Sequence, residues 1–148
     1  MECVKVLEKQ LEIKNNELLK RNNEIKKEKG VYYTPDYIVD YIVENTVGEW
    51  CKGKTVEEVS KIRICDPSCG DGRFLVRAYD FLLNWHLHYY SNSEKPQKNI
   101  IYKNKEGEWC LTFEKKKEIL LNNIYGVDID NKAVEVTQLN LLLKMLKE

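Results

Sequence analysis

The sequence predicts an α/β fold that is dominated by helices, and three observations lead to this prediction. Two short apolar runs, 62–65 and 124–127, each end at a turn that contains Asp, which is typical of short strands. Each run is followed by a long segment, 73–90 and 131–147, in which apolar residues recur at helical spacing. The alternation of strand and helix favours parallel strands that are connected by helices.

Residues 1–29 are predicted to form an amphipathic helix. They are rich in Lys, Glu and Asn and contain neither Gly nor Pro. Apolar residues recur every seven positions and make one narrow stripe, while Lys14 and Arg21 interrupt a second row. A half-polar seam is a poor coiled-coil partner, so we expect this helix to pack on its own domain or on a preceding segment. The stripe comprises Val4, Leu11, Leu18 and Ile25.

Residues 30–60 are predicted to form a second helix and a polar connection. Residues 31–34 are extended because Pro35 follows them. Thr34 is the expected N-cap of the helix, with Pro35 at its first helical position. One short helical turn is expected within residues 52–60. The expected apolar face of the helix comprises Ile38, Tyr41, Ile42 and Val47.

A β-hairpin is predicted between the two strand–helix units. After a loop at 91–98, the apolar stretches 100–102 and 109–111 flank a polar segment that contains Gly. Thr112 is expected to cap a helix that ends near Leu121.

Composition excludes several classes of protein. The 148 residues suit one domain, and no apolar run approaches the roughly 20 residues that span a bilayer. The N-terminus lacks the apolar stretch of a signal peptide, so we expect a cytoplasmic protein without membrane contact. Lys plus Arg and Asp plus Glu each number 24, and this zero net charge disfavours an autonomous nucleic-acid binder.

The cysteines and histidines do not predict a metal site. The five cysteines are irregularly spaced, and no Cys-x-x-Cys pair occurs. His86 and His88 lie far along the chain from Cys65 and Cys69, so we interpret the histidines as surface or helix-packing residues. We expect reduced, mostly buried thiols.

Two segments carry residues that are suited to ligand binding. The turn 66–74 is rich in Gly and Asp and joins a strand to the N-terminus of a helix, where open α/β sheets bind ligands. Asp128 ends the second strand, and a carboxylate there suits the two hydroxyls of a ribose. The plainer alternatives are a tight turn without a ligand and an acid that only caps the next helix, a role that Asp130 can also fill.

The type of ligand follows from what the turn lacks. A dinucleotide-binding fingerprint needs a third glycine where Leu75 stands, and no Gly-Lys-Ser/Thr phosphate loop occurs. Asp66 and Asp71 would repel a pyrophosphate but attract an ammonium or sulfonium group. These charges point to S-adenosylmethionine.

Three segments in this order resemble the N(6)-adenine-specific DNA methyltransferases of restriction-modification systems. They are Gly-Val-Tyr-Tyr-Thr-Pro at 30–35, Asp-Pro-Ser-Cys-Gly-Asp-Gly-Arg-Phe-Leu at 66–75 and Ile-Tyr-Gly-Val-Asp-Ile-Asp at 124–130. The resemblance covers roughly residues 25–148. It implies a partial Rossmann-like class I methyltransferase fold with an inserted β-hairpin, in which the helix 1–29 precedes a truncated S-adenosylmethionine-binding domain at 30–148.

The resemblance also implies roles for individual residues. Thr34 would lie near the carboxylate of the cofactor's methionine, and Asp66 would face its ammonium group. Asp128 would bind the ribose hydroxyls, and Ile129 would pack on the adenine. Asp71 stands where the family often has a small hydroxyl residue. The implied cofactor-binding residues are Tyr33, Thr34, Pro35, Asp66, Pro67, Cys69, Gly70, Asp71, Gly72, Asp128 and Ile129.

The family's catalytic segment, Asn/Asp-Pro-Pro-aromatic, does not occur in this sequence, which has three prolines and no Pro-Pro pair. We therefore expect the cofactor-binding part of an enzyme that methylates the exocyclic amine of adenine in DNA. By itself this part is expected to bind S-adenosylmethionine, to bind DNA weakly or not at all, and to transfer no methyl group.

Two alternatives remain at this point. The helical character and the missing catalytic segment also fit a non-catalytic interaction module or a subunit of a larger assembly. A methyltransferase acting on proteins or small molecules is disfavoured by the order of the motifs. A sheet of two parallel strands has open edges, which usually invite self-association. The candidates to cover them are the hairpin, the N-terminal helix or a second copy of the chain.

Overall fold

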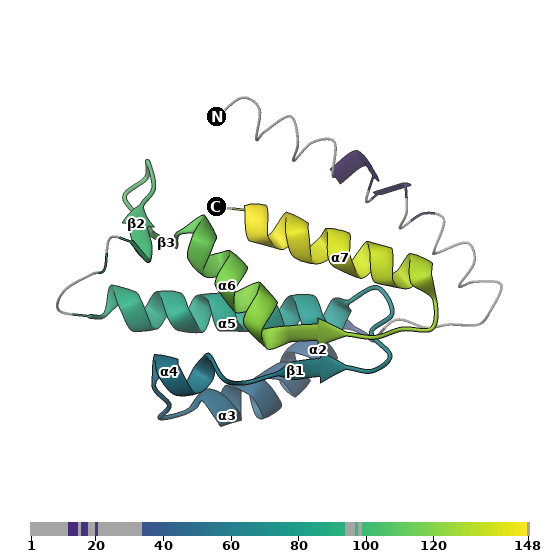
Figure 1. Ribbon diagram of the computed structural model, residues 1–148, viewed down its shortest axis with the longest axis horizontal. Coiled ribbons are helices and arrows are strands. Elements are labelled where there is room, and N and C mark those ends of the chain that lie inside the picture. The colour runs from purple at the N-terminus through teal and green to yellow at the C-terminus, as the bar shows by residue number, and fades with distance from the viewer. Residues whose placement is uncertain are drawn as a thin grey trace.

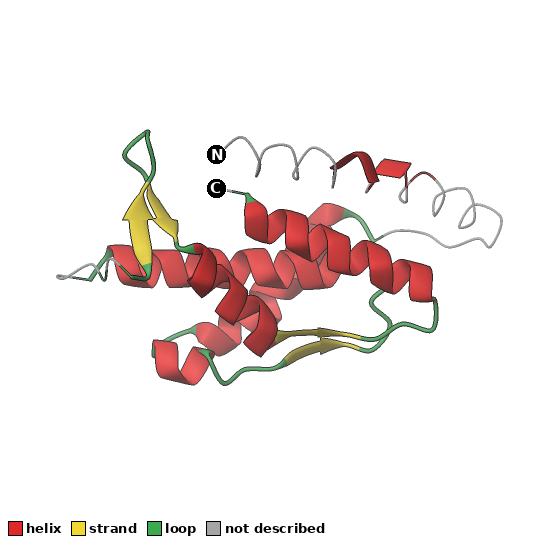
Figure 2. Ribbon diagram, turned by 45° about the horizontal axis from the view of Figure 1, so that its top comes forward, coloured by secondary structure: helices red, strands yellow, loops and turns green. Residues whose placement is uncertain are grey.

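The structure is a computed structural model in which residues 34–93, 97 and 99–147 are described, together with residues 12–14, 16, 17 and 20. It is a mixed α/β fold, rich in helices and with two small sheets (Figures 1 and 2). In chain order the elements are α2 (Asp36–Val43), the π-helix η1 (Glu44–Gly48), α3 (Glu49–Cys51), α4 (Val56–Val59), β1 (Ile64–Asp66), α5 (Arg73–Ser91), β2 (Ile101–Lys103), β3 (Trp109–Leu111), α6 (Phe113–Asn123), β4 (Ile124–Gly126) and α7 (Asn131–Leu146).

Most of the predicted N-terminal helix, including its apolar stripe, lies outside the described residues. The six positions of residues 1–29 that the structure describes are helical and exposed. The surface on which this helix packs stays a prediction.

The first sheet pairs β1 with β4 in parallel, with Ile64 opposite Ile124 and Asp66 opposite Gly126. Both strands therefore end at the same edge of the sheet. The predicted start of β1 at Ile62 is wrong, because the backbone of this residue is bonded elsewhere. Its N–H donates to the Val59 carbonyl (3.1 Å), and its carbonyl accepts a hydrogen bond from the Asn123 side chain (2.9 Å).

Helix α5 forms the centre of the molecule. It packs against α2, α6, α7 and both sheets, and Figure 1 shows α2, α3 and α4 on one side of it and α6 and α7 on the other. The buried Tyr79 hydroxyl donates to the Lys116 carbonyl of α6 (2.9 Å). The two chain turns that follow β1 and β4 lie at the N-terminal end of α5, and the predicted β2–β3 hairpin lies toward its C-terminal end (Figure 2). The buried residues of α5 are Leu75, Ala78, Tyr79, Leu82, Leu83, His86 and Tyr90.

Helix α2 differs from its prediction in two respects. Thr34 does not cap it, because Pro35 is still extended (ψ 146°) and itself serves as the N-cap, without a side-chain hydrogen bond. Of the predicted apolar face, Val47 is buried, in η1, but the buried residues of α2 are Val39 and Val43 rather than Ile38, Tyr41 and Ile42. Both sets have helical spacing, so periodicity alone could not decide which set faces α5.

The starts of α6 and α7 follow their predicted caps. Thr112 accepts a hydrogen bond from the Lys115 N–H at the start of α6, and Asp130 accepts one from the Lys132 N–H at the start of α7. The expected short turn within 52–60 is α4, where Thr55 and Glu58 form a capping box. Among the described residues, the structure contains no helix that is both long and apolar enough to cross a membrane.

Candidate functional site

The turn between β1 and α5 depends on two glycines. Gly70 and Gly72 have φ angles of +55° and +79°, in the left-handed region that L-residues with a side chain adopt only under strain. The Gly72 N–H donates to the Cys69 carbonyl (2.8 Å), and the Ser68 N–H donates to Asp66 Oδ1 (3.0 Å). The backbone of the turn is thus closed on itself by hydrogen bonds.

Asp128 contacts this turn directly. Its Oδ2 accepts a hydrogen bond from the Gly70 N–H (2.8 Å), and its Oδ1 accepts one from the Asp130 N–H (2.9 Å). The Cys69 N–H also donates to the Val127 carbonyl (2.9 Å). The turn and the acid therefore meet, as expected where two parallel strands end at the same edge of a sheet. Because the contact is direct, a ligand would lie over the two rather than between them.

Side chains of α5 and α7 pack closely against the turn and the end of β4. A Cβ atom on Gly72 would lie 2.5 Å from Cγ2 of Thr137, and a Cβ on Gly126 would lie 2.6 Å from Cδ1 of Leu75. Cys69 is buried here, and its burial raises the pKa of the thiol, so the sulfur stays protonated and serves packing.

Two side chains of α7 that the sequence analysis missed hold the turn. Thr137 Oγ1 donates to the Gly70 carbonyl (3.0 Å), and Asn140 Nδ2 donates to the Asp71 carbonyl (3.0 Å). They are polar residues three positions apart in a helix that is otherwise mainly apolar. This pattern was the signal that could have singled them out.

The segment before α2 also reaches the turn. Arg73, the first residue of α5, donates through Nη1 to the Thr34 carbonyl (3.2 Å) and pairs with Asp36 Oδ1 (2.8 Å). Thr34 and Pro35 thus lie beside the start of α5. Tyr33 lies outside the described residues.

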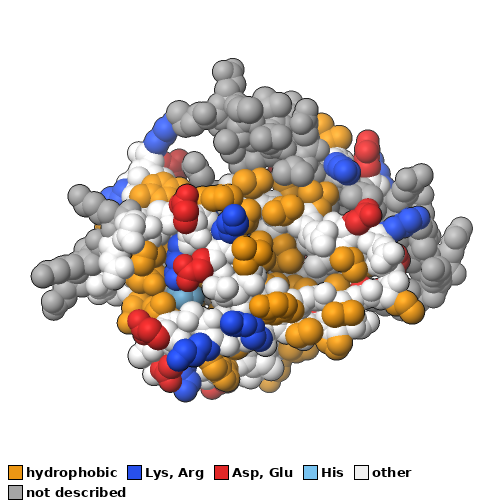
Figure 3. All heavy atoms as spheres, viewed as in Figure 1, with side chains coloured by type: hydrophobic (Ala, Val, Ile, Leu, Met, Phe, Trp, Pro, Cys, Tyr) orange, Lys and Arg blue, Asp and Glu red, His pale blue; other side chains and the backbone are white. Residues whose placement is uncertain are grey.

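The surface beside Asp128 is apolar and open. Ile129 is fully exposed, and Val127 and Tyr125 are 59% and 43% exposed. Figure 3 shows hydrophobic side chains gathered over the region of β1 and β4. The described part of the site thus combines an acidic group, a turn with backbone N–H groups and an exposed apolar side chain.

Residues 15–148 match the sequence profile of the N-6 DNA Methylase family. The chain belongs to this family. It is 38% identical over 120 residues to the type II restriction enzyme and methyltransferase RM.Eco57I of Escherichia coli, which covers 81% of this chain and 12% of that relative. It is 27% identical over 143 residues to the adenine-specific methyltransferase BrxX of Escherichia coli O9:H4, covering 75% of the chain and 10% of BrxX.

A further relative is the adenine-specific methyltransferase PglX of Lacticaseibacillus casei. It is 24% identical over 153 residues, covering 78% of this chain and 11% of PglX. This chain thus spans only about a tenth of the length of the curated relatives that it matches.

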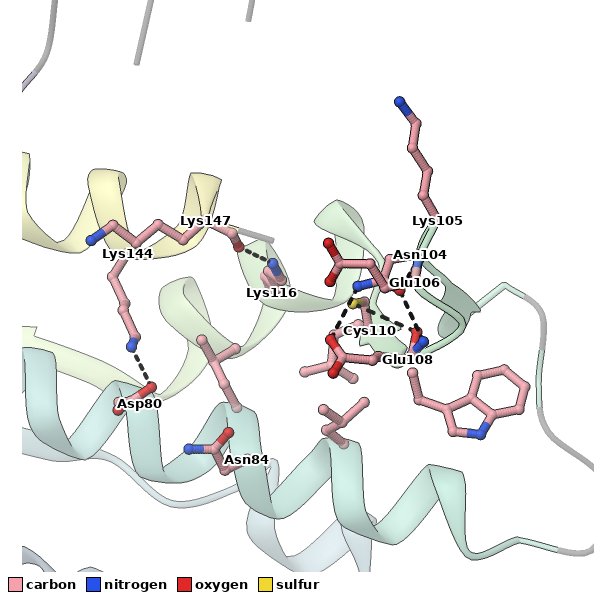
Figure 4. A pocket seen from close by; sticks show the side chains of 14 residues that line it. Asp80, Asn84, Asn104, Lys105, Glu106, Glu108, Cys110, Lys116, Lys144 and Lys147 are labelled. Atoms are coloured by element: carbon pink, nitrogen blue, oxygen red, sulfur yellow. Dashed lines mark hydrogen bonds and ion pairs between the residues drawn. The ribbon is translucent and has the colours of Figure 1, made fainter. Parts of the chain in front are cut away.

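Among the hollows that border α5, two matter for the location of the site. One, of about 550 Å³, opens between α2, α5 and α7 and borders the turn at Asp71 and Arg73. The other, of about 460 Å³, lies between the second half of α5 and the hairpin, away from the turn (Figure 4). In the second hollow Lys144 pairs with Asp80, and Lys116 donates to the Lys147 carbonyl.

The metal-ligating residue types do not cluster in the described part of the chain, where no group of three or more His, Cys, Asp or Glu side chains could hold a metal ion. His86 is buried and His88 is exposed.

Proposed function

We propose that this chain is the S-adenosylmethionine-binding part of an adenine-specific DNA methyltransferase of a restriction-modification system. The observation that carries the proposal is the hydrogen bond between the Gly70 N–H and Asp128, which joins the glycine turn to the acid at the ends of two parallel strands. Membership of the N-6 DNA Methylase family and the similarity to named DNA-modifying relatives support it.

The residues present suit the adenosyl part of this cofactor. An ionised carboxylate can accept about four hydrogen bonds. The N–H groups of Gly70 and Asp130 would therefore orient Asp128 while ribose hydroxyls donate to it. The exposed side chain of Ile129 offers an apolar face to the adenine ring, which excludes water from one side of it.

The acidic and backbone groups suit the methionine part. Asp66, at the end of β1, would attract the ammonium group of the cofactor. The negative charges of Asp66 and Asp71 would also attract its sulfonium group. Thr34 and Pro35, held beside the turn by Arg73, would close over the methionine end together with Tyr33. The backbone of Pro67, Cys69, Gly70, Asp71 and Gly72 would surround the ligand.

When bound, S-adenosylmethionine supplies a methyl group on a sulfonium sulfur, for transfer to the exocyclic amine of adenine in the DNA substrate. The residues named above bind and orient; none of them is proposed to act on the adenine. Because this sequence has no Asn/Asp-Pro-Pro-aromatic segment, we propose that the chain alone binds the cofactor but transfers no methyl group.

The proposal extends to the fold. The two strand–helix units β1–α5 and β4–α7, with β1 and β4 parallel, are proposed to be part of a Rossmann-like methyltransferase domain at residues 30–148. The β2–β3 hairpin is proposed to be an insertion between them, and residues 1–29 to be a separate amphipathic helix.

Calorimetric titration of S-adenosylmethionine into the 148-residue chain tests the proposal. We expect the unchanged chain to bind and Asp128→Ala to bind at least about 30-fold more weakly, because hydrogen bonds from the ribose to a charged group contribute about 2 kcal/mol. Glu57→Ala is the matched control, since it removes an exposed acid on α4.

Asp128→Asn gives a second reading should the alanine variant unfold. Its amide nitrogen cannot accept a hydrogen bond, so we expect it to bind weakly as well. A folded wild-type chain without binding heat, or equal affinity in all variants, would reject the proposal and favour an interaction module.

A further inference from the structure

The turn that carries Gly70 and Gly72 is fixed at four consecutive peptide groups. The Cys69 N–H donates to the Val127 carbonyl, and the Gly70 N–H donates to Asp128. The next two peptide groups are held through their carbonyls, Gly70 by Thr137 and Asp71 by Asn140. Strand β4 and the residues after it thus hold the first half of the turn, and α7 holds the second half.

The two α7 contacts come from one face of the helix. Thr137 and Asn140 are three residues apart, so their side chains point the same way. Thr137 is 4% exposed, and a buried hydroxyl is costly in an apolar helix unless it is hydrogen-bonded. Packing alone would be served equally well by valine, which has nearly the same shape but no donor. The choice of threonine therefore indicates that the hydroxyl has a role at the Gly70 carbonyl.

We infer that Thr137 and Asn140 are positioning residues, which hold the glycine turn in its binding conformation without touching the cofactor. This inference rests on the proposed function. A turn with two positive-φ glycines has many alternative conformations. If a hydrogen bond that fixes the turn is lost, part of the binding free energy is used to order the turn when the ligand binds. The affinity for S-adenosylmethionine should then fall even though every contacting residue is intact.

The test compares Thr137→Val with Thr137→Ser in the 148-residue chain by calorimetric titration of S-adenosylmethionine. We expect the valine variant to bind about five- to tenfold more weakly, because one hydrogen bond to the turn is lost. The serine variant keeps the donor and should bind within about twofold to threefold of the unchanged chain. Thr46→Val is the matched control, since Thr46 donates to the Ile42 carbonyl in η1, away from the turn.

Hydrogen exchange separates positioning from general destabilisation. In Thr137→Val we expect faster exchange of the Gly70 and Gly72 amides while the amides in the middle of α5 keep their protection. A variant that is merely less stable would lose protection throughout. Should Thr137→Val not fold, Asn140→Asp replaces the donor with an acceptor at a half-buried position, and the same loss of affinity is expected.

The outcomes distinguish this inference from the proposed function. If the unchanged chain binds no cofactor, the proposed function fails. If it binds and the folded Thr137→Val and Asn140→Asp variants bind equally well, the positioning role is wrong while the proposed function stands. Weak binding by Thr137→Ser as well would assign the effect to lost packing and would also overturn the positioning role.

Discussion

The two ends of helix α5 are built in different ways. At its N-terminal end the structure depends on the backbone: glycines with positive φ, N–H groups on a carboxylate, and carbonyls that accept bonds from α7. At its C-terminal end the structure depends on side chains. The rings of Trp85 and Tyr89 stack with centroids 5.5 Å apart, and Lys115 lies over the Tyr90 ring at 5.8 Å.

The two ends should therefore tolerate different substitutions. Where the backbone conformation requires glycine, a single added methyl group disturbs the turn. A side-chain cluster specifies mainly volume, so residues of similar size can replace one another with modest effect. The end that demands particular residues at particular spacings is the end where we propose the cofactor site.

Substitution of Gly72 should have the largest effect on stability. In Gly72→Ala the new Cβ would lie 2.5 Å from Thr137 Cγ2, and the residue has a φ of +79°. Backbone strain of about 1–2 kcal/mol adds to overpacking of about 1–3 kcal/mol, so we expect a loss of about 3 kcal/mol or more. Urea denaturation measures this loss.

A double variant shows whether the close approach is the cause. Adding Thr137→Ala to Gly72→Ala removes two of the three crowded atoms, so the two losses should be less than additive. Additive losses, or a loss below about 1 kcal/mol in Gly72→Ala alone, would contradict the view that the space beside Gly72 cannot accommodate a methyl group.

The turn and Asp128 could be predicted from the sequence alone. Glycines at a strand end permit a tight turn, and parallel strands bring their carboxyl ends together, so the proximity of the turn and Asp128 could be predicted. The direct hydrogen bond from the Gly70 N–H to Asp128 could not. The sequence was also sufficient for α5 and α7, whose apolar periodicity is long.

The rest depended on how the elements rotate against one another. The partners of Thr137 and Asn140 follow from the orientation of α7, which periodicity did not fix because this helix has apolar residues on nearly all sides. In the same way the side chain of Asn123, far along the chain, donates a hydrogen bond to the Ile62 carbonyl, so β1 begins only after Ile62. A local pattern in the sequence can single out such polar side chains, but it does not identify the distant carbonyls to which they donate.

The C-terminal end of α5 should be sensitive to pH rather than to added volume. His86 is 1% exposed, and neither of its ring nitrogens has a hydrogen-bond partner among the described residues. Burial, with a smaller contribution from the charge of Lys115, lowers the pKa of His86 from 6.5 to about 4. Between these two values the unfolded chain binds a proton that the folded chain does not, so acid favours unfolding.

The pH test compares the unchanged chain with His86→Leu. On going from pH 7 to pH 4 the unchanged chain should lose about 3 kcal/mol more stability than the variant, because 1.4 kcal/mol corresponds to about one pKa unit. Urea denaturation at each pH measures the unfolding free energies of both proteins. The titration of all other groups is common to the two proteins and cancels when these free energies are subtracted. Parallel pH profiles for the two proteins would show that His86 is not buried in its neutral form.

The smallest effect on stability should come from a pair of matched glycines. Gly70 and Gly53 have φ angles of +55° and +67°, and no described atom lies within 4 Å of a Cβ added to either. Alanine at each position should therefore cost about 1 kcal/mol of backbone strain and no overpacking. Thermal unfolding should give similar shifts for Gly70→Ala and Gly53→Ala.

Binding of S-adenosylmethionine should separate the two variants. The open space beside Gly53 adjoins the connection between α3 and α4, whereas the space beside Gly70 adjoins the turn that Asp128 contacts. A methyl group on Gly70 would keep a ligand from approaching the backbone, so its affinity should fall by about tenfold or more while Gly53→Ala binds as the unchanged chain does. Because the two stability costs are matched and only the place of the methyl group differs, equal affinities would mean that this side of the turn is not the binding surface.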